Sequence, residues 1–407
     1  MEGAEAQLTL KILRSYARIS AEATGAAEMD VETKVELVRS VGEEVITVED
    51  LRALFETKEH PVAYDGFEPS GLAHLPLGVY RPLLLRRMME AGVRFKLLLA
   101  DTFAWINNKF GGDLERIRRA GEYFIEVWRA AGVDMSKVEV LWHKDFFDDP
   151  DYWKKVLLIA KAHTLTRTRR ALTIAGRLGY EEQPAAFFFY PSMQAADIFH
   201  MRVDICQLGL DQRKVNILAR ELAHKKVGGQ PLYKLLGYEG CGVEGKPVLV
   251  HHHMLPGLRP PIEELRGYDE NPAYNRAIAW KMSKSKPETC IYVHDSREEI
   301  FRKVKMAYCP AKVVENNPIL DYVKEIIFRA FTEFTVERPA KYGGTVTYYS
   351  YAEVERDFRE GKLHPLDLKM AVAEHLDRLI APIREHFEKS KRARELYELV
   401  RSFEVTR

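Results

Sequence analysis

The sequence is poor in cysteine, balanced in charge and free of long apolar runs. Its four cysteines, Cys206, Cys241, Cys290 and Cys309, are far apart and form no C-x-x-C pair, so neither a disulfide framework nor a zinc site is expected. Lys and Arg number 61 against 60 Asp and Glu, so any attraction for nucleic acid must come from local basic patches. No apolar run has the length of a membrane helix, and the first residues lack a secretory signal pattern. We therefore expect a cytoplasmic protein that does not enter a membrane.

What the sequence does contain is an alternation of apolar strands and helices. Short apolar runs predict strands at "HPVAYDGF", "RFKLLLAD", "KVEVLW", "AAFFFY", "VDICQLG" and "KPVLVHHH". The intervening segments predict helices over 82–91, 114–131, 152–178, 193–201 and 211–224. This order predicts an α/β fold with a parallel sheet, and such sheets bind ligands beyond the carboxyl ends of their strands.

The chain is long enough for two domains. We expect a helical N-terminal extension over 1–60 and an α/β domain over 61–255. A Pro- and Gly-rich linker with a lysine-rich stretch follows over 256–295, and a mostly helical domain over 296–407.

The lysine-rich stretch is the pentapeptide KMSKS, residues 281–285. Lys281 and Lys284 can neutralise charge that develops on phosphate in a transition state, and the serines add hydroxyl donors. Most charged runs are solvated loops, and that interpretation stays open from these residues alone. The particular pentapeptide is nevertheless more specific than an arbitrary charged loop.

The stretch "FEPSGLAHLPLGVY" begins where a predicted strand ends. We expect a helix to start near His74, and the free N–H groups of a helix N-terminus suit an anion. The histidine can donate to a phosphate oxygen. The alternative is an ordinary helix cap with a surface histidine.

Polar residues also share one face of the helix expected in "YPSMQAADIFHM". Tyr190, Gln194, Asp197 and Met201 follow one another at three- and four-residue steps. A phenol, an amide and a carboxylate on a face that would otherwise be apolar form either a satisfied polar network or a small polar pocket. In the second case Asp197 faces a hydrogen-bond donor.

A fourth motif, "GLDQRK", lies where a predicted strand gives way to a helix. Gly209 allows close approach of the backbone to a ligand, and Asp211 is placed to bind a ribose hydroxyl. Arg213 and Lys214 can meet a phosphate backbone. The adjacent histidines 251–253 predict no metal site, because consecutive strand residues point to opposite faces.

With these four elements in this order, the sequence resembles the class I aminoacyl-tRNA synthetases, specifically tyrosyl-tRNA synthetases of the archaeal and eukaryotic type. The similarity runs from about Asp30 to about Lys389, and it is most specific in "AYDGFEPSG", "YPSMQAADI", "GLDQRKVNILAREL", "KMSKS", "AYCPAKVVENNPIL" and "LHPLDLKMAVAEHL". The resemblance implies a Rossmann-like catalytic domain, with 105–185 as an insert that supplies a homodimer interface, and a helical anticodon-binding domain. It implies that L-tyrosine and ATP give tyrosyl-adenylate, which is passed to tRNA(Tyr), with Mg²⁺ and no prosthetic group.

The resemblance also implies roles for individual residues. The expected tyrosine-binding residues are Tyr64, Gly66, Ala100, Tyr190, Gln194, Asp197 and Gln212. The expected ATP-binding residues are His74, Gly209, Asp211, His251, Lys281, Met282, Ser283, Lys284 and Ser285, of which His74, Lys281 and Lys284 act in catalysis. The expected tRNA-binding residues are Arg170, Arg213, Lys214, Tyr342, His364 and Asp367. Among them Tyr64 and Asp197 match the pair that binds the phenolic hydroxyl of tyrosine.

The sequence departs from the family pattern in several places. "HLPL" has no second histidine, and Phe103 and Phe147 stand where archaeal relatives often have polar residues. An insertion lies between Leu258 and Trp280. Two alternatives therefore stay open. One is a tryptophan–tRNA ligase, against which Tyr64 and Asp197 argue because tryptophan has no phenol; the other is a non-catalytic, synthetase-derived tRNA-binding protein.

Overall fold

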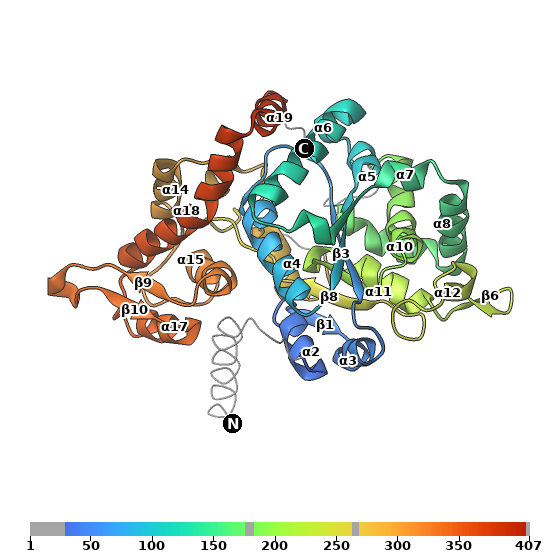
Figure 1. The fold of residues 1–407 in the computed structure, drawn as a ribbon, viewed down its shortest axis with the longest axis horizontal. Helices are drawn as coiled ribbons and strands as arrows, with labels where there is room; N and C mark the ends of the chain where they lie inside the picture. The colour runs from blue at the N-terminus through green and yellow to red at the C-terminus, as the bar shows by residue number, and fades with distance from the viewer. Residues whose placement is uncertain (1–28, 176–182, 263–267, 404–407) are drawn as a thin grey trace.

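A six-stranded sheet forms the centre of the larger part of the molecule (Figure 1). The computed structural model describes residues 29–175, 183–262 and 268–403, so the expectations for residues 1–28 lie outside the described residues. The strand order is β1-β8-β5-β2-β3-β4, and all neighbours are parallel except β1, which is antiparallel to β8. The strands are β1 (Glu44–Ile46), β2 (Val62–Phe67), β3 (Arg94–Leu99), β4 (Val138–Trp142), β5 (Ile205–Gly209) and β8 (Val248–His252).

The chain reverses its direction of progress across the sheet between β2 and β5. From β2 it runs outward through β3 to β4, and then returns to build β5 and β8 on the other side. Such a switch point leaves a crevice at the carboxyl ends of the strands, where ligands bind in open parallel sheets. Every residue of β5 and β8 is buried, which is why both read as continuous apolar runs.

Helices cover both faces of the sheet. Side chains alternate along a strand, so Phe95 and Leu97 of β3 join the core beneath α4 and α6, whereas Leu98 joins the core beneath α8, α10 and α11. The helices of this part are α2 (Val31–Arg39), α3 (Val48–Thr57), α4 (Arg81–Glu90), α5 (Asp101–Ile106), α6 (Leu114–Ala130), α7 (His143–Phe147), α8 (Pro150–Ala162), α9 (Leu165–Ala171), α10 (Tyr190–His200), α11 (Arg213–Leu222), α12 (Leu232–Leu235) and α13 (Pro272–Trp280). The short strands β6 (Lys226–Val227) and β7 (Gln230–Pro231) pair beside α12.

Three predictions about local structure were wrong. "AAFFFY" is not a strand but a 3₁₀ turn, Ala185–Phe189, which leads into α10; only Phe187 of its phenylalanines is buried, and a short apolar run does not separate strand from helix. The helix expected over 152–178 is broken, because His163 is extended and Thr164 caps α9 by accepting from the N–H of Arg167. The N-terminal region is not all helical, since β1 adds an antiparallel edge strand.

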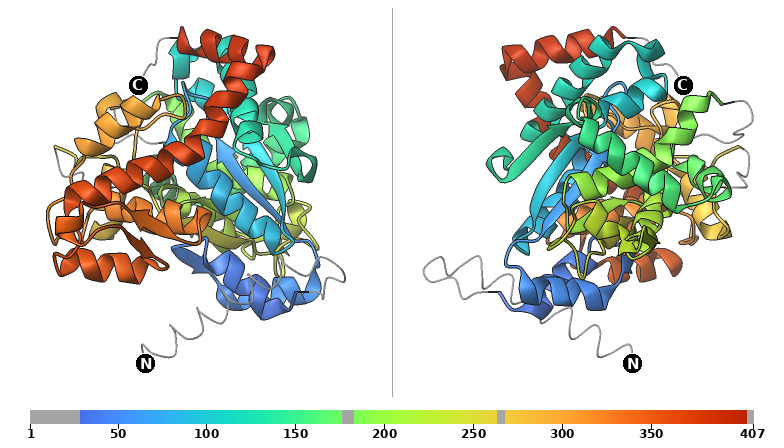
Figure 2. Two further views of the ribbon diagram at one scale, coloured as in Figure 1. Left: turned by 60° about the vertical axis from the view of Figure 1, so that its left-hand side comes forward. Right: turned by 90° about the vertical axis from the view of Figure 1, so that its right-hand side faces the viewer.

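The C-terminal part is mainly helical and rests on the sheet domain. Its elements are α14 (Arg297–Lys305), α15 (Pro318–Tyr322), a π-helical turn (Val323–Ile327), α16 (Phe328–Ala330), β9 (Phe334–Val336), β10 (Val346–Tyr348), α17 (Tyr351–Arg359), α18 (Pro365–Lys389) and α19 (Lys391–Arg401). Figure 2 shows α18 crossing from this part toward the sheet domain, where α19 packs against α6. None of the helices in the described ranges has the length and apolarity needed to cross a membrane.

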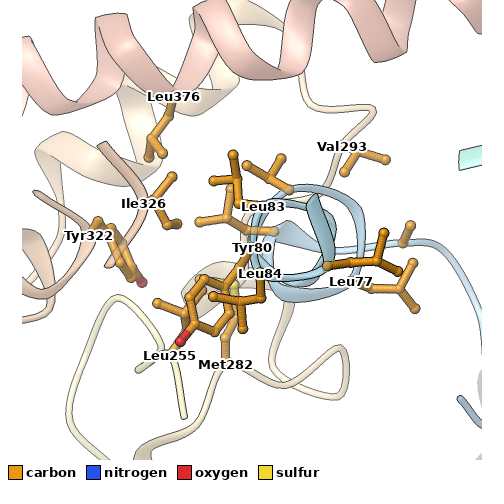
Figure 3. Packing of buried hydrophobic residues seen from close by; sticks show 14 of the residues in the cluster. Leu77, Tyr80, Leu83, Leu84, Leu255, Met282, Val293, Tyr322, Ile326 and Leu376 are labelled. Atoms are coloured by element: carbon orange, nitrogen blue, oxygen red, sulfur yellow. The ribbon is translucent and has the colours of Figure 1, made fainter. Parts of the chain in front are cut away.

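An apolar cluster joins the two parts (Figure 3). Tyr80 and Leu84, from the helix that follows β2, lie against Tyr322 and Ile326 of the C-terminal part, and all four side chains are buried. Met282 of the KMSKS stretch is buried in the same cluster. Burial of a methionine side chain contributes about 1.5–3 kcal/mol to the stability of the fold. This residue therefore anchors the stretch to the domain junction.

Candidate active site

A cavity of about 690 Å³ opens at the carboxyl ends of the central strands, within the usual size range of a small-molecule site. The predicted residues in its wall are Tyr64, Gly66, His74, Ala100, Tyr190, Gln194, Asp197, Gly209, Asp211, Gln212, Lys281, Met282, Ser283, Lys284 and Ser285. Five separate segments of the chain supply them, so the fold brings together the motifs that the sequence spaces far apart. His251 is the one residue of the predicted tyrosine and ATP sets that the cavity wall does not include.

Tyr64 and Asp197 lie in the wall of this cavity. The Tyr64 hydroxyl is buried and finds no hydrogen-bond partner among the described residues, and burial raises the pKa of this phenol well above its usual value. Asp197 is 1% exposed. Its Oδ1 accepts from the hydroxyl of Tyr152 at 2.7 Å and from Nε2 of His143 at 2.9 Å. A buried carboxylate beside an unpaired phenol offers both an acceptor and a donor to one hydroxyl of a ligand.

The other polar residues of α10 are held by a second network. The Tyr190 hydroxyl donates to Oε1 of Glu68, whose other oxygen accepts from the side-chain amide of Asn107 at 3.1 Å. Gln194 Nε2 donates to Oε1 of Gln212 at 3.0 Å. The shared helix face predicted for Tyr190, Gln194 and Asp197 is therefore present, and it borders the cavity.

Phe103 gives this region an aromatic wall. Its ring meets the rings of Tyr190 and His143 edge to face, with both centroid distances at 4.6 Å. Phe147 does not line the cavity; it packs against Trp153, with ring centroids 5.2 Å apart. The sequence departure at Phe103 thus makes the cavity more apolar without displacing the phenol and carboxylate pair.

Gly209 and Asp211 form the wall at the end of β5. A Cβ atom at Gly209 would approach Oδ1 of Asp211 to 2.7 Å and the sulfur of Met254 to 2.9 Å, so only glycine leaves this wall open. Asp211 Oδ2 accepts from Nζ of Lys281 at 2.9 Å. Burial opposes ionisation of Asp211, yet the charge and hydrogen bond of Lys281 hold the pKa of the carboxyl below its usual value. The first KMSKS lysine is therefore paired with a carboxylate of the cavity wall.

Lys284 also points inward. Its Nζ donates to the backbone oxygen of Ser70 at 2.7 Å and lies 4.9 Å from the centre of the Phe124 ring. Desolvation lowers the pKa of this amine to about 7, and the positive charges of Lys109 and Arg81 act in the same direction. No carboxylate of the described residues pairs with it, so its amine is available to an anionic ligand.

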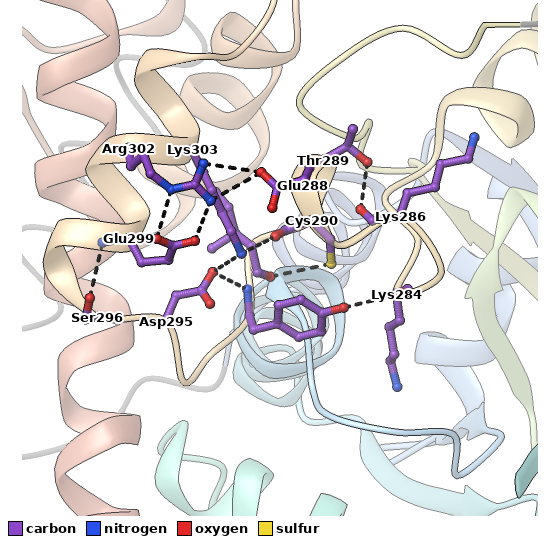
Figure 4. A network of polar contacts seen from close by, with 12 residues as sticks. Lys284, Lys286, Glu288, Thr289, Cys290, Asp295, Ser296, Glu299, Arg302 and Lys303 are labelled. Carbon is purple, nitrogen blue, oxygen red and sulfur yellow. Dashed lines mark hydrogen bonds and ion pairs between the residues drawn. The ribbon is translucent and has the colours of Figure 1, made fainter. Parts of the chain in front are cut away.

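The loop is tied to helix α14 by a chain of contacts (Figure 4). The Tyr292 hydroxyl donates to the backbone oxygen of Lys284 at 3.0 Å, and the Tyr292 N–H donates to Asp295 at 3.0 Å. Lys303 of α14 donates to Asp295 at 2.7 Å and to the backbone oxygen of Cys290 at 2.8 Å. The position of Lys284 thus depends on a helix of the C-terminal part.

The two motifs predicted to bind ATP are also joined by their backbones. Residues 73–75 pair with residues 291–293, which follow the KMSKS stretch: Leu75 N donates to Ile291 O at 2.8 Å and Val293 N to Ala73 O at 3.1 Å. The helix begins close to His74, as predicted, with the π-helical turn Pro76–Tyr80. The His74 Nδ1 atom is buried without a partner among the described residues, and desolvation lowers the pKa of the ring well below its usual value. A neutral imidazole therefore borders the cavity.

Leu77 stands where a second histidine would complete the family motif. It is buried and contributes apolar surface to the cavity. Gly78 lets the helix approach the paired segment, because a Cβ atom there would come within 2.4 Å of the Val293 side chain. Gly78 thus serves packing between the motifs rather than contact with a ligand.

The structure does not bring His251 to the cavity. His251 is fully buried on the other face of β8, where its Nδ1 lies 2.7 Å from Glu44 and its Nε2 lies 3.1 Å from the Asn216 amide. His252 and His253 line the cavity instead. Adjacent residues of a strand point to opposite faces, which explains why His252 and not His251 faces the cavity. His253 follows the end of β8.

Arg213 and Lys214, predicted to meet tRNA, are engaged by neighbouring segments. Arg213 forms two hydrogen bonds with Glu44, at 2.8 and 3.1 Å, and lies 3.8 Å from Asp269. Burial opposes ionisation of Glu44, but His251 and Arg213 hold its pKa at about 2. Lys214 donates to the backbone oxygen of Tyr268. Residues 268 and 269 of the insertion thus contact the start of α11. Arg170 is exposed in a separate hollow between α9 and α11.

The predicted anticodon readers lie on the C-terminal part. Tyr342 is 61% exposed, and His364 caps α18 by accepting from the N–H of Leu366. Asp367 lies in the first turn of the same helix. Arg338 donates to the oxygens of Gly344 and Lys362 at 2.9 and 2.8 Å, so it ties the loop of Tyr342 to the segment before His364.

Sequence reasoning missed Glu68, Arg81, His143 and Tyr152. Glu68 lies within the quoted motif "FEPSG", and His143 directly follows the predicted strand "KVEVLW", so the rule that ligands bind beyond strand ends signals both. Arg81 lines the cavity and pairs with buried Asp65, at 2.8 Å for its Nε. Only the fold reveals the roles of Arg81 and Tyr152, because their partners are distant in sequence.

The sequence model of the family described as tRNA synthetases class I (W and Y) matches residues 56–261 and 272–381. The chain therefore belongs to this family of class I aminoacyl-tRNA synthetases. Tyrosine--tRNA ligase 1, cytoplasmic, of Arabidopsis thaliana is 43% identical over 93% of this chain and 90% of its own length. Tyrosine--tRNA ligase of Pyrococcus horikoshii is 45% identical over 93% of this chain and its whole length. The crystal structure of tyrosyl-tRNA synthetase complexed with L-tyrosine from Pyrococcus horikoshii has a TM-score of 0.82, covering 92% of this chain and 100% of that chain.

Proposed function

We propose that this chain is a tyrosine–tRNA ligase, which activates L-tyrosine with ATP and transfers it to tRNA(Tyr). The observation that carries the proposal is the buried Tyr64 hydroxyl, which has no partner among the described residues, in the same cavity as buried Asp197. A bound tyrosine would place its phenolic oxygen between them, donating to Asp197 and accepting from Tyr64. Phenylalanine would leave both polar groups unpaired, which a buried site rejects strongly.

The rest of the cavity suits the remainder of tyrosyl-adenylate. Glu68 lies beside Tyr190 and can bind the ammonium group of the amino acid, with Gln194 and Gln212 nearby. Asp211 can bind the ribose hydroxyls, as acidic residues do at strand ends of nucleotide folds. Lys281 and Lys284 then face the phosphates.

The chemistry requires no covalent group from the protein. The tyrosine carboxylate oxygen attacks the α-phosphorus of ATP, and the bond to pyrophosphate breaks. A hydroxyl of the terminal adenosine of tRNA then attacks the acyl carbonyl, and AMP leaves. The chain contributes positioning and charge stabilisation: Lys281 and Lys284 neutralise the phosphoryl oxygens as negative charge builds on them.

Mg²⁺ would accompany ATP rather than occupy a protein cage. Two carboxylates of the cavity wall are engaged, Asp211 with Lys281 and Glu68 with Tyr190 and Asn107. Mg²⁺ keeps several waters and binds mostly through substrate phosphates in such sites, so this donor set fits an ion carried by the nucleotide. When bound, the ion would shield the charge of the phosphates.

We further propose a cytoplasmic homodimer that reads tRNA at two places. Exposed Arg170 would contact the acceptor end, and Tyr342, His364 and Asp367 the anticodon. Arg213 and Lys214 can join the acceptor contact only if Glu44 and residues 268–269 release them. Exposed apolar side chains in the predicted insert support its role as an interface: Trp105, Leu157 and Leu165 are 43%, 59% and 58% exposed.

Amino-acid-dependent exchange of pyrophosphate into ATP, run with tyrosine, tryptophan and phenylalanine, tests the function. We expect exchange with tyrosine, followed by charging of tRNA(Tyr). Exchange with tryptophan alone would establish the tryptophan ligase. Binding of tRNA without exchange for any amino acid would establish a non-catalytic tRNA-binding protein.

A further inference from the structure

A histidine with no solvent exposure stands behind the carboxylate of the tyrosine pocket. His143 is the first residue of α7, directly after β4, and is 0% exposed. It is absent from the cavity wall. Its Nε2 lies 2.9 Å from Oδ1 of Asp197, and its Nδ1 contacts the hydroxyl of Thr102. The ring is thus fixed at both nitrogens.

These contacts determine where the proton of His143 sits. An ionised carboxylate only accepts hydrogen bonds, so Nε2 must carry the proton that points at Asp197. In the neutral ring Nδ1 is then an acceptor, and the Thr102 hydroxyl is its donor. The edge-to-face contacts with Phe103 and Phe146, at centroid distances of 4.6 and 5.4 Å, keep the ring from turning.

The two carboxylate oxygens of Asp197 differ in their hydrogen bonds. Both hydrogen bonds to the carboxylate, from His143 and Tyr152, fall on Oδ1. Oδ2 has no partner among the described residues, and neither has the Tyr64 hydroxyl. One oxygen is therefore committed to the protein and the other is left for the ligand.

We propose that His143 is a positioning residue that sets the selectivity for tyrosine by holding Asp197 with Oδ2 toward the substrate phenol. The proposal rests on the proposed role of Asp197 in binding that phenol. His143 does not touch the substrate; it acts through the carboxylate. Its donor stabilises a buried negative charge, and hydrogen bonds to charged groups are stronger than those between neutral groups.

Matched substitutions at His143 test the donor. His143→Gln keeps an N–H near the position of Nε2, whereas His143→Leu removes it with little change in volume. We expect His143→Leu to lower the ratio of kcat/KM for tyrosine to that for phenylalanine by about tenfold or more, chiefly through the KM for tyrosine, with the KM for ATP unchanged. His143→Gln should restore most of the ratio.

Thr102 provides a second test that leaves the imidazole in place. Thr102→Val removes the donor that fixes the tautomer, while Thr102→Ser keeps it. We expect a smaller loss of selectivity in the valine variant and none in the serine variant. If His143→Leu does not fold, the two Thr102 variants still test whether His143 positions Asp197.

The outcomes distinguish a failure of the role of His143 from a failure of the proposed function. Unchanged selectivity in both His143→Leu and Thr102→Val would overturn the role of His143, as would an equal loss of activity toward tyrosine and phenylalanine. If the unmodified protein fails to exchange with tyrosine, the proposed function fails, whatever the variants do. Loss of selectivity in His143→Leu with rescue in His143→Gln supports the proposal.

Discussion

Lys281 Nζ lies 2.9 Å from Oδ2 of Asp211, so a lysine of the KMSKS stretch neutralises the carboxylate proposed to bind the ribose of ATP. The charge of Asp211 raises the pKa of Lys281 against the opposing effect of burial, and both groups remain ionised near neutral pH. We propose that ribose hydroxyls bound to Asp211 would offer it other donors and would free Lys281 to move to the phosphates. Nucleotide binding and the charge of the loop would then be linked through this ion pair.

Removing either inward lysine should slow adenylate formation more than it weakens tyrosine binding, because the charge they stabilise develops in the transition state. We expect Lys281→Ala and Lys284→Ala to lower the rate about 10²-fold with little change in the dissociation constant for tyrosine. Lys286→Ala is the matched control, since Lys286 is exposed and outside the cavity wall. Single-turnover kinetics measure the rate. An equal loss in tyrosine affinity would contradict the assigned role.

ATP binding should take up a proton at alkaline pH. The pKa of Lys284 is about 7 in the ligand-free protein, because desolvation favours the neutral amine. Above pH 7 the amine is mostly neutral, whereas a bound phosphate favours its charged form, so binding must protonate it. Calorimetry in buffers of different ionisation enthalpy should show proton uptake at pH 8.5 and less at pH 6, and Lys284→Met should remove the difference. Equal uptake at both pH values would exclude this linkage.

Tyr292 should support the rate of activation from outside the cavity. Its hydroxyl holds the backbone of Lys284 at 3.0 Å, so Tyr292→Phe should reduce kcat for pyrophosphate exchange several-fold and leave tyrosine affinity unchanged. Tyr308→Phe is the control, because the Tyr308 hydroxyl has no hydrogen bond to the described residues. If both variants exchange at the rate of the unmodified protein, the hydroxyl does not position the loop.

The Tyr342 side chain should contribute to tRNA binding and not to activation of the amino acid. Stacking of a base on an aromatic side chain is worth about 1–3 kcal/mol, so Tyr342→Ala should raise the KM for tRNA roughly tenfold or more without affecting pyrophosphate exchange. Tyr349→Ala is matched to it, since the two tyrosines are 61% and 63% exposed. Equal effects of both variants on charging would remove Tyr342 from the anticodon site.

Much of this architecture was predictable because its signals are local. The buried strands β3, β5 and β8 appear as apolar runs, and the faces of α10 and the loop motifs follow from residue spacing. The pairing of residues 73–75 with 291–293 joins segments more than two hundred residues apart in the sequence, and no local pattern encodes it. His251 illustrates the same limit, because the alternation of side chains along β8 places His252, and not His251, at the cavity.

We propose that Asp197 and Tyr64 together recognise the phenol of tyrosine. The ratio of kcat/KM for tyrosine over that for phenylalanine in pyrophosphate exchange, measured before and after Asp197→Asn, tests this recognition directly. The amide keeps the size of the side chain but removes the negative charge that would accept the hydrogen bond from the phenol. We predict a large preference for tyrosine in the unmodified protein and a fall of about two orders of magnitude or more in the variant. An unchanged ratio would contradict recognition by Asp197 and Tyr64, because the phenol would then be recognised elsewhere.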